Sequence, residues 1–358
     1  MLVAIHKTPY GSVHKWLSRY EQILLFNDIR FVRVELGDPS FWDTVSKADL
    51  FVFRYGHYDT DHQKAQTLIP LLERQLQIKC FPNVTTCWHY DDKIRQYYLM
   101  RNAGFPMTDS YIFWERAQAL AWLAAAPLPV VFKLKGGAGS NNVLLVRSRG
   151  QGERLIKTMF GRGMITNGVS DSAAVRFAHF NLYRELHHLA GNAYRAMRGE
   201  DVSEFWQRQK NYVLFQKFLP GNPHDTRVTI IGDRAFAFRR LVRTNDFRAS
   251  GSGLIEYEPQ QIDLRCVQIA FQVSKTMEFQ SMAYDFLFNA DGDPEFCEIS
   301  YIFWDSAIFR CPGHWDENLN WHTGHTWPQF AILQDLLAPG IRQPSSNQME
   351  TAQAGGHT

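Results

Sequence analysis

The stretch Val130-Val-Phe-Lys-Leu-Lys-Gly-Gly-Ala-Gly-Ser-Asn-Asn-Val-Leu-Leu-Val146 places a glycine-rich turn between two short apolar runs. Apolar runs of this length around glycines are typical of a β-hairpin. The glycines let the backbone turn sharply and expose its N–H groups, while Lys133 and Lys135 supply positive charge suited to phosphate oxygens. The stretch therefore predicts a hairpin domain that can bind phosphate. An ordinary hairpin turn with exposed lysines remains the alternative, because the GK[ST] of a P-loop is missing and a strand follows.

Upstream of this hairpin, the apolar pattern alternates between strand and helix periodicity. We expect strands at 2–5, 31–36, 50–54 and 78–81, and helices at 13–26, 61–76 and 91–102. This alternation is typical of a parallel α/β layer. We expect the layer to end near residue 105, where the texture changes to short strands.

Downstream of the hairpin, residues 147–210 are polar and arginine-rich, follow a mostly helical pattern and are interpreted as an insertion. Two further hairpins are expected, one formed by 227–231 and 235–242 and the other by 283–288 and 295–299. Gly232-Asp233 and Asp291-Gly292 would form their turns. The last twenty residues are rich in Pro, Gly, Gln, Ser and Ala, which predicts a disordered tail.

The composition excludes several classes of protein. The length of 358 residues exceeds the roughly 150 of a typical domain, so more than one core is expected. A formal charge of +2 provides no global field for nucleic acid or an anionic membrane. The five cysteines include no CxxC pair, the apolar start is too short for a signal peptide, and no uncharged run is long enough to span a membrane. We therefore expect a cytoplasmic protein with reduced thiols.

Two acidic residues on the last predicted hairpin form a candidate metal site. Asp285 and Glu298 lie on the two strands of this hairpin, and in a regular hairpin both carboxylates can point from one sheet face. Their hard oxygens suit Mg²⁺ that also carries substrate phosphates. Asp285 stands in an apolar stretch, where an unpaired charge would be costly, so it needs a partner. The alternative is a pair of carboxylates that face water at a strand edge.

A cationic cluster follows the arginine-bearing hairpin and its next loop, at Arg227, Arg234, Arg239, Arg240, Arg243 and Arg248. Strand alternation puts Arg227 and one of Arg239 or Arg240 on the face opposite their neighbours, and the loop around Arg248 could fold over an anionic ligand. Solvated strand arginines are the alternative explanation. Cys311, His314, His322 and His325 have spacings that a zinc site could use, but the set is irregular and tryptophans interrupt it.

Taken in order, six pieces of the chain resemble the ATP-grasp superfamily over about residues 50–305. The nearest branch is that of the ribosomal-protein glutamate ligases and related carboxylate-amine ligases. The six pieces are Asp92-Lys93 before Gly104-Phe-Pro106, Lys133 to Asn142, Gln216-Lys-Phe-Leu-Pro-Gly221, Asp225-Thr-Arg227, Asp246-Phe-Arg248, and Asp285 with Glu298-Ile-Ser300. The resemblance implies a mixed α/β (α+β) fold with two lobes that clamp a nucleotide. The implied domains are a pre-ATP-grasp domain (1–104), a central lobe (105–211) with the helical insertion 147–210, a C-terminal lobe (212–338) and the tail (339–358).

The resemblance also implies roles for individual residues. Nucleotide contacts would come from Lys93, Lys133, Lys135, Gly137, Gly139, Ser140, Gln216, Lys217, Phe218 and Leu219. Asp285, Glu298 and Ser300 would hold the metal, and Arg227, Arg240 and Arg248 would act in catalysis. Two positions depart from the family pattern: Ser300 stands where an Asn ligand is usual, and Gln216 stands where Glu is common.

The activity implied is an ATP-dependent, ADP-forming carboxylate-amine ligase that uses an acyl phosphate, with ATP and Mg²⁺, for which Mn²⁺ can substitute. Its partners would be a small-molecule carboxylate and an amine, and the resemblance leaves a homodimer open. The ending Glu298-Ile-Ser-Tyr301 resembles proteins of surface-polysaccharide biosynthesis, which implies a uronic acid or an amino acid as substrate. An ATP-binding regulatory or scaffold protein and an ATP-dependent phosphotransferase on the same fold remain alternatives.

Overall fold

The computed structural model describes residues 1–7, 11–137, 142–167, 206–243, 247–337 and 340–345, with 190, 193, 194, 197 and 198. The backbone divides into two compact units. The first unit comprises residues 1–56, 63–90 and 222–358, and the second comprises 57–62 and 91–221. The sequence predicts a boundary near residue 105, whereas residues 91–104 already belong to the second unit.

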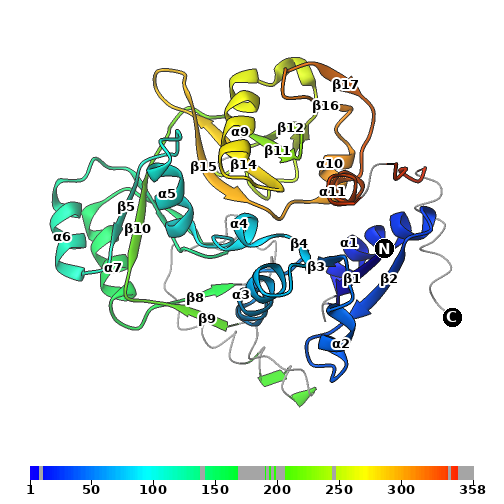
Figure 1. Cartoon of the computed structure of the whole chain (residues 1–358). Coiled ribbons are helices and arrows are strands. Elements are labelled where there is room, and N and C mark those ends of the chain that lie inside the picture. The colour runs from blue at the N-terminus through cyan, green and yellow to red at the C-terminus, as the bar shows by residue number, and fades with distance from the viewer. Residues whose placement is uncertain are drawn as a thin grey trace. The chain divides into compact units, whose positions relative to one another are not determined.

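The first unit begins with a four-stranded parallel sheet in the order β2-β1-β3-β4 (Figure 1). Its strands are β1 (Leu2–His6), β2 (Arg30–Val34), β3 (Leu50–Val52) and β4 (Lys79–Phe81). The accompanying helices are α1 (Gly11–Phe26), α2 (Phe41–Val45), α3 (Asp59–Arg74) and α4 (Val84–Cys87), and the first residues of α3 are grouped with the second unit. The central strands β1 and β3 are buried, as expected of a parallel sheet covered on both faces. The parallel α/β layer predicted from the sequence is confirmed.

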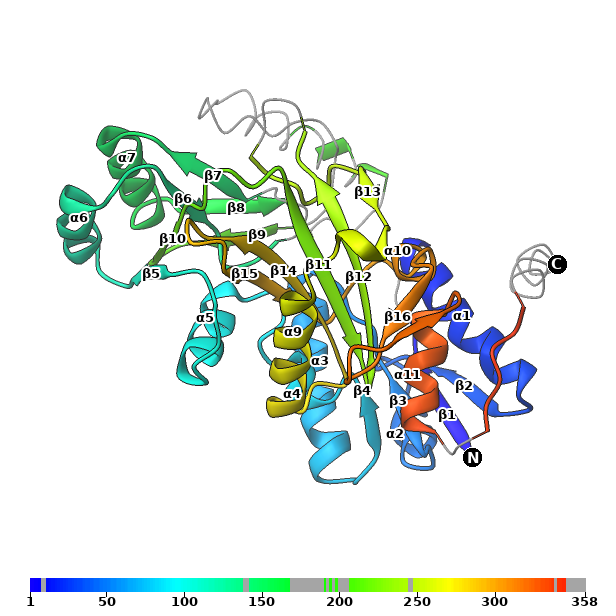
Figure 2. The same ribbon diagram turned by 90° about the horizontal axis from the view of Figure 1, so that it is seen from above.

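The first unit also contains a seven-stranded sheet in the order β15-β14-β11-β12-β16-β17, with β13 paired to β12. Its strands are β11 (His224–Ile231), β12 (Arg234–Leu241), β13 (Ile255–Glu256), β14 (Ser281–Phe288), β15 (Pro294–Ser300), β16 (Gly313–Trp315) and β17 (Trp321–Thr323). The helices are α9 (Leu264–Thr276), α10 (Asp305–Phe309) and α11 (Pro328–Leu336), with a 3₁₀ turn at Pro259–Gln261. Figure 2 shows β14, β11 and β12 side by side, and α9 packs against them.

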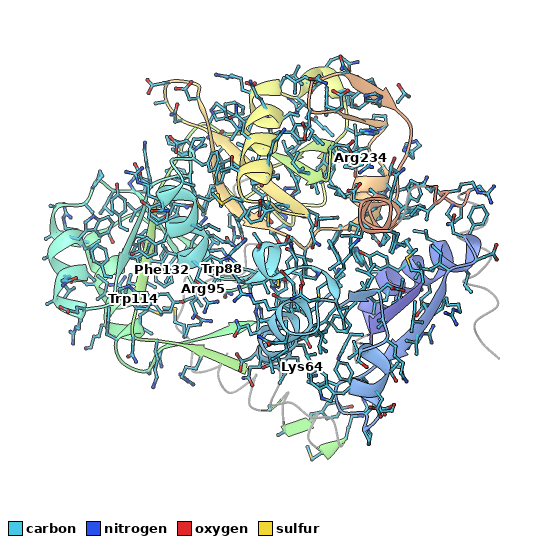
Figure 3. All side chains as sticks on the ribbon, viewed as in Figure 1. Lys64, Trp88, Arg95, Trp114, Phe132 and Arg234 are labelled. Carbon is cyan, nitrogen blue, oxygen red and sulfur yellow. The ribbon has the colours of Figure 1, made fainter. Side chains whose placement is uncertain are left out.

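Both predicted hairpin turns of this sheet are present. Gly232 has φ 56° and Gly292 has φ 79°, backbone conformations that favour glycine. A Cβ on Gly232 would also meet Asp335 Oδ2 at 2.1 Å. That carboxylate accepts a 3.0 Å hydrogen bond from Arg234, which is labelled in Figure 3.

One apolar core joins the two sheets of the first unit. Its members include Val3, Leu50 and Phe81 of the parallel sheet together with Phe236 and Phe303 of the C-terminal part. All five are almost fully buried, so the N-terminal layer and residues beyond 222 are stabilised by the same removal of apolar surface from water.

The second unit contains a four-stranded sheet in the order β5-β10-β6-β7 and a two-stranded sheet of β8 and β9. Its strands are β5 (Ser110–Phe113), β6 (Val130–Lys133), β7 (Val143–Val146), β8 (Met164–Asn167), β9 (Trp206–Gln209) and β10 (Val213–Lys217), and its helices are α5 (Lys93–Asn102), α6 (Arg116–Ala125) and α7 (Arg149–Met159). Phe132, labelled in Figure 3, lies in a core with Phe215, whose ring stacks on Trp122. The predicted hairpin of β6 and β7 is confirmed.

The residues from 147 to 210 differ in part from the helical pattern expected. Residues 149–159 form α7, but 164–167 and 206–209 pair as antiparallel strands. Most of 168–205 lies outside the described residues, as do 338, 339 and 346–358, so the disordered-tail expectation falls largely outside them. Within the described chain, no helix is both long enough and apolar enough to cross a bilayer.

Candidate functional site

The glycine turn after β6 is a position that only glycine can occupy without strain. Gly137 has φ +97°, and a Cβ there would lie 2.1 Å from the side-chain nitrogen of Asn142. The same Asn142 nitrogen donates to the carbonyl of Gly136 at 3.2 Å. The turn is therefore fixed by its backbone angle and by one amide side chain. The predicted ligands Gly139 and Ser140 lie outside the described residues.

Two charged side chains hold Gly137 from either side. Its N–H donates to Asp91 Oδ1 at 2.7 Å, and its carbonyl accepts from Lys93 Nζ at 2.9 Å. Burial raises the pKa of Asp91, but His57, whose Nδ1 lies 3.2 Å from Oδ2, acts together with Lys93 and His62 to outweigh it and leaves the pKa below its usual value. Asp91 is therefore charged. In this arrangement the N–H of Gly137 is used inside the protein, so it orders the turn here and does not offer a donor to phosphate.

Lys133 lies at the end of β6 and is 7% exposed. Among the described residues, no carboxylate and no hydrogen-bond acceptor pairs with its ammonium group. A cation so far removed from water is costly unless an anion accompanies it. Lys135 differs: 3.6 Å separates its ammonium from Asp92, it is partly exposed, and its backbone N–H donates to the hydroxyl of Tyr212.

The predicted adenine hinge follows β10. Gln216 is buried and its side-chain nitrogen donates to Ser110 at 3.2 Å, inside the sheet. The backbone N–H of Lys217 donates to the carbonyl of Asp109, while its side chain is exposed. Leu219 is buried and Phe218 is half-buried. All the described nucleotide candidates thus lie in the second unit.

The first unit carries a row of charged side chains across four neighbouring strands. Glu298 on β15 lies opposite Asp285 on β14, which lies opposite Arg227 on β11. Asp225, two residues before Arg227 on the same face, lies opposite Arg240 on β12. The pattern of two arginines and three carboxylates gives the row one net negative charge.

Asp285 is the centre of this row. Its oxygens accept from Arg227 Nε at 2.6 Å and Nη2 at 2.8 Å, and Arg240 Nη2 lies 2.7 Å from Oδ2. Burial raises the pKa of Asp285, but the two guanidinium groups outweigh it and hold the pKa well below its usual range. Arg240 also forms a two-bond pair with Asp225, at 2.8 and 2.6 Å. Burial dominates at Asp225 and raises its pKa, although Arg240 opposes the effect.

The donor set beside Asp285 fits a hard divalent cation. A carboxylate has about four lone-pair positions; two of those on Asp285 accept hydrogen bonds from Arg227, and Oδ2 also forms an ion pair with Arg240, so Oδ1 keeps a position for a metal. Glu298, its cross-strand neighbour, is half-buried and supplies a second carboxylate. Oxygen ligands of this kind, with the other positions left to water and phosphate, suit Mg²⁺.

Ser300 departs from the expected metal ligand. Its hydroxyl donates to the carbonyl of Ile302 at 2.9 Å and accepts from the N–H of the same residue at 3.1 Å. The side chain is thus used in a local turn. Arg248 lies in the loop after β12, outside the charged row, with its guanidinium 5.9 Å from the ring of Phe247.

The four residues with zinc-like spacing do not form a metal site in the described chain. Cys311 is buried in the core, and the ring of His325 bonds the carbonyls of Phe309 and Cys311. His314 and His322 stack with ring centroids 5.2 Å apart. Within the described ranges, no three His, Cys, Asp or Glu side chains form a group able to hold a metal ion.

The sequence reasoning missed three supporting features: Asp91, Tyr212 and the pairing role of Asp225. Asp91 has φ 53°, which no sequence pattern indicated. Asn142 belongs to the glycine stretch already singled out from the sequence. Asp225 is two residues before Arg227, so a carboxylate near that arginine was the available signal for its pairing. Tyr212 stands directly before β10, a position that gave no signal.

Compared by sequence, the chain matches no protein-family model and no curated protein. Solved structures do match. A RimK domain protein of the ATP-grasp type from Sphaerobacter thermophilus has a TM-score of 0.53 at 12% identity, covering 94% of this chain and 99% of that one. The D-cycloserine synthetase DcsG has a TM-score of 0.55 at 15% identity, over 94% and 100% of the two chains. The biotin carboxylase domain of Hydrogenobacter thermophilus 2-oxoglutarate carboxylase, complexed with MgADP and bicarbonate, has a TM-score of 0.57 at 13% identity, over 97% and 71%.

The chain therefore has the ATP-grasp fold, with RimK-type proteins among the structures that share it, as the resemblance of its motifs implied.

Proposed function

We propose that this protein is an ATP-dependent, ADP-forming carboxylate-amine ligase. The observation that carries the proposal is Lys133, a lysine at 7% exposure without an anionic partner in the described chain, next to a glycine turn ordered by Asp91 and Lys93. A polyphosphate is the anion that such a buried lysine suits best. The shared fold adds support, since one structure that has it holds MgADP.

The chemistry follows from the weakness of a carboxylate as an acyl donor. A carboxylate oxygen would attack the γ-phosphorus, the bond to the bridging oxygen would break, and ADP would leave. The amine would then attack the acyl carbon, phosphate would leave with the electron pair of the C–O bond, and the amine would lose a proton. Lys133 and Lys135 would stabilise the phosphate charge, and Arg227 and Arg240 the anionic acyl intermediate.

Asp285 and Glu298 would hold Mg²⁺, which supplies charge stabilisation at the phosphate oxygens when bound. We assign Arg248 and the residues 216–219 the same roles that the resemblance implies, and we keep the domain division 1–104, 105–211 and 212–338 as part of the proposal. An amino acid or a uronic acid is the first carboxylate to test.

The decisive experiment is an ADP-release screen of carboxylates against amines, with mass spectrometry of the products. We expect ADP release that requires both substrates and yields an amide. Glu298→Gln should reduce the rate at least 100-fold, whereas Glu258→Gln, an exposed glutamate of the same unit, should not. ADP release that is indifferent to every pair would contradict the proposal, and a phosphorylated product without an amide would identify a phosphotransferase.

A second candidate is an ATP-binding regulatory protein on the same fold. It is favoured by Ser300, whose hydroxyl is used in a local turn where a third metal ligand is usual. If Mg-ATP binds tightly, no substrate pair releases ADP, and Glu298→Gln leaves cellular function intact, this candidate replaces the ligase.

A further inference from the structure

Arg54 lies at the carboxyl edge of the parallel sheet in the first unit. It follows β3 by two residues, and β3 is an interior strand between β1 and β4. In open parallel sheets, ligands bind outside the carboxyl ends of the strands, because loops diverge there. Arg54 therefore stands at the edge of the sheet where ligands are expected.

The guanidinium of Arg54 has no ion pair and no hydrogen bond within the described residues. Its Nε is shielded from solvent and lacks an acceptor. The group lies over the ring of Trp16, with its central carbon 4.7 Å from the ring centroid. Such stacking covers the face of a guanidinium, but its five N–H donors point outward in the plane and still require acceptors.

The neighbours of Arg54 are also donors without acceptors. Trp16 Nε1 and the Tyr20 hydroxyl are both buried and unpartnered in the described chain, and the two rings pack with centroids 5.1 Å apart. Burial raises the pKa of Tyr20 well above its usual value, with Arg54 opposing the effect, so the phenol stays protonated and can donate. Three unpartnered donor groups, one of them cationic, therefore occur together.

Asp305, a carboxylate that acts on Tyr20, is already occupied. Asp305 raises the pKa of Tyr20, which places it close to the cluster. Its Oδ2 accepts from Arg19 and, at 2.8 Å, from Gln329, while its Oδ1 accepts from the N–H of Ser306 at 2.7 Å. Asp305 thus does not neutralise Arg54 by a direct ion pair.

The cluster is connected to the charged row through Tyr301. The Tyr301 hydroxyl donates to the carbonyl of Tyr55 at 3.0 Å and accepts from the N–H of Tyr55 at 3.3 Å. Tyr55 directly follows Arg54 in the chain. Tyr301 is three residues from Glu298, about 10 Å along an extended backbone. Burial raises the pKa of Tyr301 and Arg54 opposes this effect, so the guanidinium lies near the Tyr301 hydroxyl, a short extended segment away from Glu298.

We propose that Arg54, together with Trp16 Nε1 and the Tyr20 hydroxyl, binds a carboxylate of the substrate that does not itself react. One guanidinium matches a single negative charge in a planar two-oxygen group better than it matches a phosphate dianion. The anion site stands on the unpartnered donors alone, and the identification of its occupant as a substrate rests on the proposed ligase function.

Binding is tested without nucleotide by NMR of the arginine Nε–H groups, with L-glutamate, succinate and inorganic phosphate as probes. We expect succinate or L-glutamate to shift the Arg54 resonance, assigned by its absence in Arg54→Lys. Arg33, whose Nε already donates to Glu21 at 2.6 Å, serves as the internal control and should not shift. No Arg54 shift with either carboxylate, or a shift with phosphate only, would overturn the proposal.

The second experiment uses kinetics on any active substrate pair. Replacing the non-reacting carboxylate of the substrate by its amide should raise KM at least 10-fold in the wild type and change it little in Arg54→Gln, with kcat affected far less than KM. Arg74→Gln, at an exposed position on α3, should behave as wild type. Equal discrimination in wild type and Arg54→Gln would overturn the proposal. If no pair is active, the ligase function fails while the NMR result still decides the site.

Discussion

Lys133 is 7% exposed and has no counter-ion among the described residues. Its replacement by Met removes a desolvated cation and keeps the stem, so the free energy of unfolding should change little or rise. Mg-ATP affinity should fall at least 10-fold and turnover should be lost. Calorimetry and thermal unfolding check both parts. The exposed Lys157→Met on α7 is the matched control, and unchanged nucleotide affinity in Lys133→Met would remove Lys133 from the site.

Arg240 is the most enclosed cation of the charged row. It pairs with both Asp225 and Asp285, and these carboxylates outweigh burial and raise its pKa. Arg240→Met leaves buried carboxylate charge unpaired, so we expect a loss of about 3–5 kcal/mol in the free energy of unfolding by urea. Arg265→Met, which breaks the exposed pair of Arg265 with Asp263, should change the free energy of unfolding far less. Similar losses in both variants would show that the row contributes no more than a surface ion pair.

His6 gives the molecule a dependence of stability on pH. It ends β1 and packs on Phe53 with ring centroids 4.2 Å apart, and burial lowers its pKa from 6.5 to about 4. The unfolded chain therefore binds the proton more tightly. The stabilising contribution is complete above pH 6.5 and is lost as the pH falls towards 4, by at most about 3 kcal/mol.

The matching variant is His6→Gln, compared with wild type by urea unfolding at pH 4.5 and pH 7.5. We expect the difference in unfolding free energy between the two proteins to shrink at the lower pH. If wild type and His6→Gln differ by the same unfolding free energy at pH 4.5 and pH 7.5, the pKa of His6 is the same in the folded and the unfolded chain.

The proposed nucleotide binding depends on the backbone conformation of Gly137, in the turn that follows β6. An Ala at Gly137 would require a positive φ, which costs about 1 kcal/mol, and its Cβ would meet Asn142 at 2.1 Å. Gly137→Ala should weaken Mg-ATP binding at least 10-fold with only a small change in melting temperature. Gly137→Ala with Asn142→Ala removes the steric overlap but keeps the strained angle, so it should recover part of the affinity.

Gly37→Ala is the control for this element, since no atom lies within 4 Å of a Cβ there and its φ is not positive. Full affinity in Gly137→Ala would show that the turn does not depend on its left-handed residue.

Helices, strands and turns were predictable from the sequence where neighbouring residues alone determine the backbone conformation. The period of the apolar residues gave the parallel strands, and Gly232 and Gly292 gave the two hairpin turns. Arg227 and Asp285 were each identified as candidates, but their direct pairing depends on the register of β11 against β14, which the sequence does not encode locally. Similarly, β8 and β9 pair across some 40 intervening residues, and the helical pattern around them concealed this pairing.

At the scale of the molecule, the core of the first unit explains a division that the linear sequence did not predict. Phe81 and Phe236 belong to one apolar cluster, so the N-terminal layer is stabilised by residues beyond 222. Composition cannot indicate which distant apolar faces meet, because burial is non-directional. The proposed phosphate residues and the proposed metal residues consequently belong to different units.

This separation makes the coupling between Lys133 and Glu298 the most searching test of the proposal. If one Mg-ATP contacts both residues, each single variant, Lys133→Met or Glu298→Gln, disrupts part of the same interaction, and their effects on affinity should not add. We expect a coupling of about 1 kcal/mol or more in a double-mutant cycle measured by calorimetry with a nonhydrolysable ATP analogue. The control cycle pairs Lys133→Met with Glu258→Gln, which is exposed and should be additive. Additivity in both cycles would mean that Lys133 and Glu298 do not contact the same nucleotide, and the ligase assignment would then lose its physical basis.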